Sequence, residues 1–287
     1  MTWTDYHIHS DYCDGEGSLK EYVEEALKLK LHAIGFSSHA PSPCKLNWGM
    51  KQEDLDNYCA SIRKLGRKYT EQMGIYLGLE VDYIPEIMSP RNPEYDALIL
   101  DYVIGSVHVL DFFEDGRYWM VDANVENFRD GLERLFDGNI RKVVEEYYRR
   151  VRMMIEESCP DVVGHLDVVK MNNGDERFFS EDEMWYQDAI YETLEVISSH
   201  RTVIEVNTGG MSRGRIKSPC PSPWILEQCL RMGIPVTLNS DSHNPVALTA
   251  FFKPMADMLI SIGFRELQIL DVGGWHPCPF EAEGLLW

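Results

Sequence analysis

The chain has 287 residues, of which 47 are acidic and 27 are basic, so its formal net charge is −20. A nucleic-acid-binding protein normally presents a basic face to the phosphates, and this sequence shows no such concentration of positive charge. No stretch reaches the roughly 18 consecutive apolar residues of a membrane span, and the N-terminus lacks the basic and apolar regions of a signal peptide.

The seven cysteines are odd in number and are never spaced Cys-x-x-Cys. This usage is typical of reduced thiols in a cytoplasm, and it disfavours both a disulfide framework and a thiolate zinc site. Hydrophobic residues make up 44% of the chain, which is enough for a sizeable core. We therefore expect a cytoplasmic protein without a nucleic-acid or membrane partner. The sequence does not predict its oligomeric state.

Short apolar strands alternate with amphipathic helices along the whole chain. A capping box, Ser18-Leu-Lys-Glu21, opens the first helix, and Ser222-Pro223 opens a later helix that Gly233 closes. The other helices are expected at about 51–73, 124–157, 180–199 and 246–262. The expected strands are 3–9, 33–39, 75–83, 102–109, 161–169, 202–207, 235–239 and 266–270.

This alternation predicts a parallel sheet whose outer face is covered by helices. Seven or eight such units in one uninterrupted run favour a β/α barrel over an open, doubly wound sheet. Because we find neither a composition break nor a linker, we expect residues 1–287 to form a single domain. In such a barrel the chemistry takes place at the carboxyl ends of the strands.

Nine imidazole and carboxylate side chains stand at these carboxyl ends, contributed by six different strands. A single histidine there is more often structural, but the coincidence across six strands points to a metal site. The nine residues are His7, His9, Asp14, His39, Glu80, His108, His165, Asp241 and His243.

Nitrogen and oxygen donors without a thiolate suit Zn, Mn, Fe or Mg. Nine side chains are too many for one ion, so two or three divalent ions are expected. Three ions with three carboxylates and six neutral imidazoles would give a local charge of about +3. A very acidic protein could hold a phosphate in this way.

The motifs around these residues resemble those of the polymerase and histidinol phosphatase (PHP) superfamily, in order and spacing, over nearly the whole chain. Three stretches are most similar to the monofunctional histidinol-phosphatases: Gly78-Leu-Glu-Val-Asp-Tyr-Ile-Pro85, Ile104-Gly-Ser-Val-His108 and Gly164-His-Leu-Asp-Val-Val-Lys170. The resemblance implies a distorted (β/α)7 barrel, similar to a TIM barrel, with a trinuclear metal centre. It also implies hydrolysis of a small phosphate ester, L-histidinol phosphate, in histidine biosynthesis.

Carried over residue by residue, the resemblance implies three sets of ligands. His7, His9, Glu80 and Asp241 would hold the first ion; Glu80 would bridge to a second ion held by His108 and His165; Asp14, His39 and His243 would hold the third. Some relatives have histidine where this chain has Asp14. Two ions bridged by Glu80 would share a water and turn it into a hydroxide that attacks phosphorus. The candidate catalytic residues are Glu80, Asp241 and His243.

Basic residues for the phosphate are expected in the loop after residue 207. Arg213, Arg215 and Lys217 lie within five residues there, and an arginine fork matches phosphate oxygens. The alternative for this loop is ordinary solvation. Lys170 is a further candidate, as a phosphate contact or as one half of a salt bridge. The aromatic segment 111–119 and Trp48 could cover the substrate, although such aromatics more often pack in a core.

Three other functions remain open from the sequence. One is a PHP relative acting on another small phosphate ester or on nucleotides, which the low basic charge disfavours. Another is a metal-dependent amidohydrolase, a family that also begins with His-x-His but often bridges two metals through a lysine. The last is a metal-binding module without catalysis, which the full set of nine candidate ligands disfavours.

Overall fold

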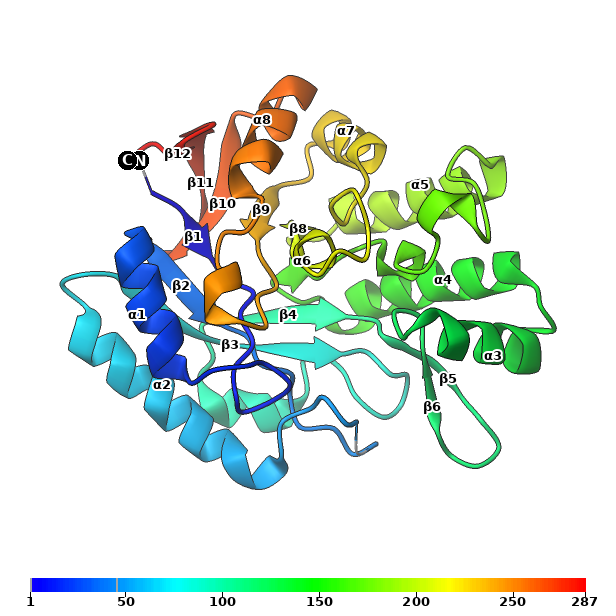
Figure 1. Cartoon of the computed structure of the whole chain (residues 1–287), viewed down its shortest axis with the longest axis horizontal. Helices are drawn as coiled ribbons and strands as arrows, with labels where there is room; N and C mark the ends of the chain where they lie inside the picture. Colours follow the sequence, from blue (N-terminus) through cyan, green and yellow to red (C-terminus); the bar gives the residue numbers. More distant parts are fainter. Residues whose placement is uncertain (1, 45) are drawn as a thin grey trace.

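The computed structural model describes residues 2–44 and 46–287. Its centre is a seven-stranded sheet in the order β1-β2-β3-β4-β7-β8-β9, and neighbouring strands in this order pair in parallel (Figure 1). The strands of this sheet are β1 Thr4–Asp5, β2 Ala33–Phe36, β3 Gly74–Asp82, β4 Tyr102–Ser106, β7 Val162–Val163, β8 Val203–Asn207 and β9 Val236–Asn239.

The sheet closes between its first and last strands at their carboxyl ends. Ile8 and Ser242 form a parallel bridge there. The amide of His9 donates to the carbonyl of Ser242 over 2.9 Å, and the amide of Ser242 donates to the carbonyl of His7 over 3.0 Å. The prediction of a distorted (β/α)7 barrel is confirmed. The distortion is greatest at β1 and β7, which have only two paired residues each.

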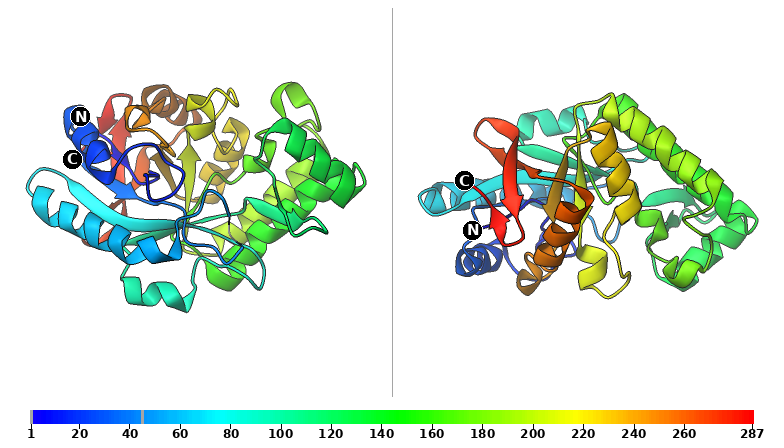
Figure 2. Two further views of the ribbon diagram at one scale, coloured as in Figure 1. Left: turned by 60° about the horizontal axis from the view of Figure 1, so that its bottom comes forward. Right: turned by 90° about the horizontal axis from the view of Figure 1, so that it is seen from above.

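Helices cover the outside of the barrel, and α4 runs alongside α5 on one flank (Figure 2). The capping box of α1 forms as predicted, since Ser18 and Glu21 each cap the backbone of the other. Pro223 begins α7, and Gly233 ends it in the left-handed conformation. The α-helices are α1 Leu19–Leu29, α2 Leu55–Tyr69, α3 Val125–Phe136, α4 Ile140–Ser158, α5 Met184–Ser198, α6 Gly209–Ser212, α7 Pro223–Met232 and α8 Phe252–Ile262.

Aromatic side chains fill the amino-terminal end of the barrel. Tyr6 and Tyr102 are buried there, and the hydroxyl of Tyr102 donates to the carbonyl of Tyr6 over 2.6 Å. Gly78 leaves the space that the Tyr102 ring needs, because a Cβ at this position would lie 2.4 Å from the ring. Trp275 packs edge-on against Tyr6. Since this end is plugged, a substrate can reach the barrel interior only from the carboxyl end.

Several predicted elements have different bounds in the structure, and two of them show the reasons. The expected helix over 124–157 is two helices, because Asp137 and Gly138 both have positive φ (54° and 70°) and Asn139 caps α4 by accepting from the amide of Lys142. The expected strand over 161–169 pairs only at β7, and residues Val168–Lys170 form a 3-10 turn. The regular structure stops at Asp137-Gly138-Asn139 in the first case and after Val163, at Gly164-His165, in the second.

Two small antiparallel sheets are absent from the sequence prediction. One is a hairpin of β5 Val109–Phe112 and β6 Tyr118–Met120, which follows β4. The other joins β10 Glu266–Asp271, β11 Gly274–Glu281 and β12 Gly284–Leu285. Pro277 and Pro279 make the sequence of β11 resemble that of a loop. The amide of Phe280 donates to the carbonyl of Arg265, next to β10. Because amides of alternate residues face opposite sides of a strand, the nitrogens of both prolines face away from β10, and neither proline removes a hydrogen bond between the two strands.

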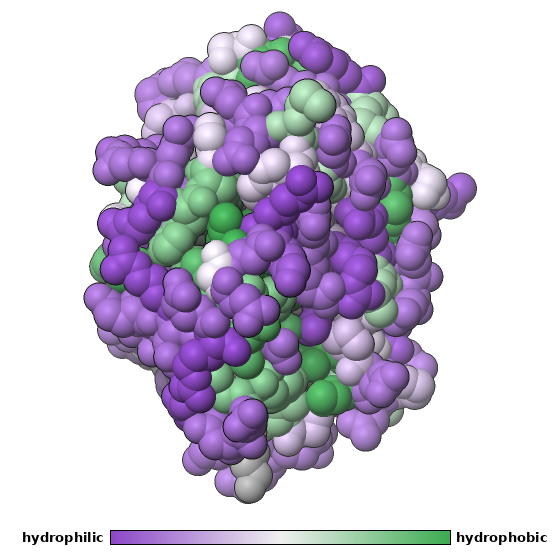
Figure 3. All heavy atoms as spheres, turned by 90° about the vertical axis from the view of Figure 1, so that its right-hand side faces the viewer, coloured by the Kyte–Doolittle hydropathy of each residue, from purple (hydrophilic) through white to green (hydrophobic). Residues whose placement is uncertain are grey.

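The two ends of the chain lie side by side (Figure 1), and the amide of Leu285 donates to the carbonyl of Thr2 over 2.9 Å. One window, Pro245–Ile262, is long and apolar enough to cross a membrane by length and composition alone. Its α-helix, α8, has only 11 residues, and Phe252, Met255 and Leu259 are buried against the core. The face on the side of α3 to α5 is mostly hydrophilic (Figure 3).

Candidate metal centre

The nine side chains predicted from the strand ends converge at the open end of the barrel. Seven of them are buried, whereas Asp14 and His243 stand at the mouth with 34% and 26% of their side chains exposed. A cavity of about 250 Å³ opens among them; its lining includes Asp14, His39, Glu80, His108, His165, Asp241 and His243. Residues that are up to 236 positions apart in sequence thus share one site, as the barrel prediction requires.

Glu80 lies at the centre of the site, and its two oxygens face different groups of imidazoles. Oε2 lies 3.2 Å from Nε2 of His7, 3.4 Å from Nε2 of His9 and 3.0 Å from Nδ1 of His39. Oε1 lies 3.1 Å from Nε2 of His165 and 3.8 Å from Nε2 of His108. A carboxylate placed in this way can bridge two cations.

Two further groupings lie on either side of Glu80. Asp241 Oδ1 is 3.3 Å from Nε2 of His9 and 3.8 Å from Nε2 of His7. Nearer the mouth, Asp14 is 3.3 Å from Nε2 of His243, 3.7 Å from Nδ1 of His9 and 4.0 Å from Nε2 of His39. The His39 ring therefore lies between Glu80 and Asp14 and belongs to both neighbourhoods.

The nitrogen and oxygen atoms of the site are arranged as ligands of metal ions rather than as hydrogen-bond partners of one another. Nε2 of His7, Nε2 of His9 and Nδ1 of His39 are buried and make no hydrogen bond to the described residues, although all three surround one oxygen of Glu80. A buried nitrogen without a partner needs an explanation. Ligands about 2.0–2.1 Å from a tetrahedral ion lie about 3.3 Å apart, which matches most of these separations. The residues therefore fit divalent ions.

Two buried carboxylates behind the imidazoles were missed in the sequence. Glu205 Oε2 lies 2.8 Å from Nδ1 of His7, and Asp82 Oδ1 lies 2.8 Å from Nδ1 of His108. Each leaves the Nε2 of its histidine facing Glu80, and a carboxylate behind the ring is the usual arrangement for a metal-bound imidazole. The strand period of two could have revealed both residues, because Asp82 follows Glu80 by two and Glu205 interrupts an otherwise apolar strand.

The carboxylates of the site and the His9 ring are in the forms that bind cations, whereas neighbouring carboxylates outweigh the effect of burial and raise the pKa values of His7, His108 and His243, which lose a proton when they bind a metal. Burial raises the pKa values of Glu80 and Asp241, but the surrounding histidines and, for Asp241, the Arg213 guanidinium hold both well below their usual range. Burial together with the neighbouring His243 and His39 lowers the pKa of His9 to about 3, so its ring is neutral. Ionised carboxylates and a neutral imidazole are the forms that metals require.

The backbone at Asp241 is held in a conformation that places its carboxylate in the site. Its φ of 48° is unusual for a residue other than glycine, and such strain often accompanies function. Gly209 gives this carboxylate room, since a Cβ there would lie 2.6 Å from Asp241 Oδ2. Arg213 then fixes it, with Nη2 3.0 Å from Oδ2.

The basic candidates occupy different places. Arg213 lines the cavity, with Nη1 3.2 Å from Nδ1 of His243. Arg215 also lines it, but its guanidinium donates to the backbone carbonyls of Asp122 and Ala123. Lys217 is an exposed residue paired with Asp175.

The position of Lys170 in the structure does not suit phosphate binding. It does not line the cavity but is buried, with Nζ 2.7 Å from Asp167 and 2.8 Å from the carbonyl of Pro219. Burial lowers the pKa of Lys170, but the Asp167 carboxylate outweighs this effect and raises it. Of the two roles considered for Lys170, the contacts are those of the salt bridge.

Two covering segments meet above the cavity. Trp48, from the loop after β2, packs edge-on against Tyr118 of the β5–β6 hairpin at 5.0 Å, and both Trp48 and Met120 line the cavity. Most of the aromatic residues of segment 111–119 serve packing instead, as Trp119 does against Phe128.

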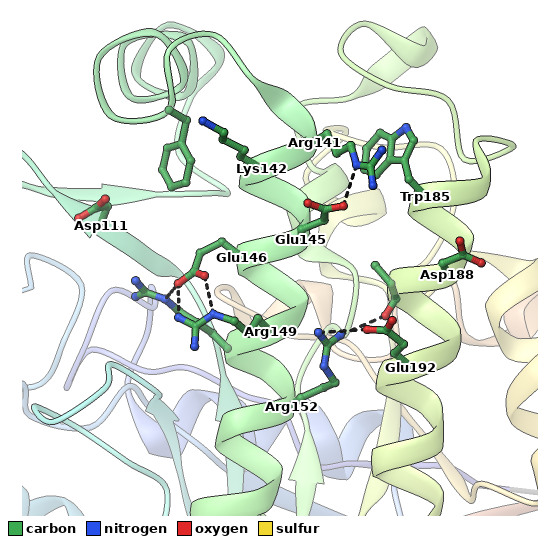
Figure 4. Close-up of a pocket in the computed structure, with 13 residues that line it drawn as sticks. Asp111, Arg141, Lys142, Glu145, Glu146, Arg149, Arg152, Trp185, Asp188 and Glu192 are labelled. Atoms are coloured by element: carbon green, nitrogen blue, oxygen red, sulfur yellow. Dashed lines mark hydrogen bonds and ion pairs between the residues drawn. The ribbon is translucent and has the colours of Figure 1, made fainter.

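A second hollow of about 630 Å³ lies between α4 and α5, away from the imidazoles (Figure 4). Its charges neutralise one another: Arg141 pairs with Glu145, Arg149 and Arg150 pair with Glu146, and Arg152 pairs with Glu192. None of the nine candidate ligands lines it. The smaller cavity, which the candidate ligands line, is therefore the candidate site.

The chain is similar in sequence to a known domain family and to several named proteins. The model of the PHP domain matches residues 5–209. A Deinococcus radiodurans protein named as a probable histidinol-phosphatase is 30% identical over 91% of this chain and 94% of its own length. The histidinol-phosphatase of Bacillus subtilis is 29% identical over 85% of this chain and 94% of its own.

A crystal structure of histidinol phosphate phosphatase from Lactococcus lactis, in complex with zinc, L-histidinol and phosphate, has the same fold. It superposes with a TM-score of 0.67 and 20% identity, covering 100% of this chain and 99% of the other.

Proposed function

The chain belongs to the PHP domain family, and we propose that it is a metal-dependent histidinol-phosphatase, which hydrolyses L-histidinol phosphate to L-histidinol and phosphate. The relatives that carry this name align over 85% or more of the chain. The observation that carries the proposal is the convergence of nine nitrogen and oxygen donors around Glu80 in a cavity of the size of a small ester.

We propose divalent ions as cofactors, with zinc the ion held by the Lactococcus lactis enzyme. Three groups of donors support three ions: His7, His9, Glu80 and Asp241; Glu80, His108 and His165; Asp14, His39 and His243. Divalent ions at such a site polarise phosphoryl oxygens and lower the pKa of a bound water.

The side chains of the chain itself supply orientation and charge. Glu80 and Asp241, which stay ionised, fix the imidazoles around the cavity. Arg213 is the proposed phosphate ligand, because its guanidinium lines the cavity beside His243 and can donate to phosphoryl oxygens. Trp48, Met120 and Met171 line the remaining wall and would exclude water from the bound ester.

The alternative functions have less support. A cavity of about 250 Å³ suits a small phosphate monoester better than a nucleic-acid strand. A bridging lysine, as amidohydrolases often have, is not among the cavity-lining residues, and Glu80 stands at the bridging place. The seven cysteines are free thiols, which agrees with the proposed cytoplasmic location. We further propose that residues 1–287 act as one domain, since β12 pairs with the beginning of the chain.

The test is phosphate release from a panel of monoesters by the metal-loaded protein. We expect kcat/KM for L-histidinol phosphate to exceed that for ribose phosphate, glycerol phosphate and nucleoside monophosphates by at least tenfold. Equal rates on every ester would contradict the substrate assignment, while leaving the metal-dependent phosphatase activity in place.

A further inference from the structure

Asp122 is an acid of the cavity wall that the sequence analysis did not single out. It follows β6 and lines the cavity together with His108 and Arg213. Its Oδ1 is buried and makes no hydrogen bond to any residue in 2–44 or 46–287. No ion pair to Asp122 is found among these residues either. A buried carboxylate oxygen without a donor is costly and calls for a ligand that supplies one.

The backbone around Asp122 is held firmly in place. The carbonyl of Asp122 accepts from Nη1 of Arg215 over 2.6 Å, and the carbonyl of Ala123 accepts from Nη2 of Arg215 over 2.9 Å. Asn172 donates to the carbonyls of Val121 and Ala123, over 3.3 and 2.8 Å. Arg215 therefore uses its donors on the carbonyls of Asp122 and Ala123 and on Oδ1 of Asn172, and it fixes the segment that presents the Asp122 carboxylate.

Asp122 and the proposed phosphate ligand come from different loops. Arg213 lies in the loop after β8, where it contacts Asp241 and His243. Asp122 lies after the β5–β6 hairpin, and its neighbour Val121 donates to the carbonyl of His108 over 3.0 Å. Apolar side chains of Trp48, Met120, Val168 and Met171 complete the lining. The cavity thus offers the Arg213 guanidinium beside His243, an unpartnered carboxylate oxygen of Asp122 and an apolar wall, while the second lining arginine, Arg215, donates to backbone carbonyls.

We infer that Asp122 binds the ammonium group of the substrate and selects phosphate monoesters whose alcohol carries a primary amine. This inference rests on the proposed function and adds the specificity residue to it. An ammonium has three donors and a full charge, so it satisfies the buried Oδ1 and neutralises the carboxylate together. Arg213 would hold the phosphate end, and Arg215 acts as a positioning residue through the Asp122 backbone.

The experiment compares L-histidinol phosphate with its des-amino analogue, the phosphate ester of imidazolyl propanol, on the metal-loaded enzyme. In Asp122→Asn the ratio of kcat/KM for the amine ester to that for the des-amino ester should fall roughly 10- to 100-fold relative to wild type, as expected for a lost charged hydrogen bond. Asp122→Ala should show the same direction. Inhibition by the product L-histidinol should weaken in parallel, while metal content stays the same.

Asp115→Asn is the matched control, because it removes the same charge from the tip of the same hairpin, where Asp115 is exposed and paired with Arg117. It should keep the wild-type ratio. An unchanged ratio in both Asp122 variants, or equal losses on both esters accompanied by loss of metal, would overturn the inference while leaving the proposed function standing. If the wild-type enzyme did not cleave L-histidinol phosphate, that result alone would contradict both the proposed function and this inference.

Discussion

The amide of Ser242 donates to the carbonyl of His7 over 3.0 Å, and this contact joins the last strand of the barrel to the first. It brings Asp241 to within 3.3 Å of His9, although the two residues are 232 positions apart. The first proposed group of metal ligands therefore depends on closure of the barrel at this point. The same contact that closes the barrel brings these candidate ligands together.

Replacing Asp241 should separate chemistry from folding. Asp241→Asn removes the carboxylate charge near His7 and His9, so we expect one ion fewer per chain and a loss of at least 10²-fold in kcat for L-histidinol phosphate. The circular dichroism spectrum should stay that of wild type, since the replacement has the same shape. A fully active variant with wild-type metal content would refute the assignment of Asp241.

The outer carboxylate Glu205 should matter to metal affinity without touching the substrate. Glu205→Gln weakens the hold on Nδ1 of His7, and losses of such partners typically cost about 10- to 100-fold in metal affinity or activity. Competition with a zinc chelator measures this change directly. Glu192→Gln, at an exposed side chain of α5, is the control, and it should bind metal as wild type does. Equal affinity of the two variants would contradict the role of Glu205.

The two arginines of the loop after β8 should behave differently. Arg213→Ala should raise KM for every phosphate monoester, because the lost guanidinium would face the phosphoryl group that all of them share. Arg215→Ala instead frees the carbonyls of Asp122 and Ala123, so its loss should depend on whether the ester carries an amine. Identical substrate profiles for the two variants would show that they share one role.

Lys170 should contribute to stability, with a defined pH dependence. Lys170→Met leaves the buried carboxylate of Asp167 unpaired, which should cost about 3–5 kcal/mol in the free energy of unfolding. Because the pKa of Lys170 in the folded chain is raised from its usual 10.5, its contribution is complete below pH 10.5 and disappears as the pH rises through the folded value. Urea unfolding at neutral and strongly alkaline pH measures this. A difference between wild type and variant that grew with pH would contradict the assignment.

The barrel and the nine clustered residues could be predicted from the sequence, because both follow from where the strands lie and where they end. Alternating strands and helices gave the barrel, and the residues at the strand ends gave all nine members of the cluster, because parallel strands carry their carboxyl ends to one edge. Even the neighbourhood of His9 and Asp241 followed from the need to close the barrel.

Side-chain partners inside the sheet were harder to predict. The period of two within a strand singles out Asp82 and Glu205, but which histidine each of them contacts depends on the register of neighbouring strands. Lys170 follows β7 as a phosphate ligand would, yet the turn at Val168–Lys170 directs it to Asp167. Asp122 lies in a hairpin-to-helix connection whose position is set by Arg215, from a loop about 90 residues later.

The central claim is that this cavity hydrolyses L-histidinol phosphate with the help of bound divalent ions. The most direct test is phosphate release from this ester by protein stripped of metal with a chelator, and then by the same protein after zinc is restored. The account predicts that activity is lost on stripping and returns in proportion to the zinc bound. Full activity of the metal-free protein would contradict it.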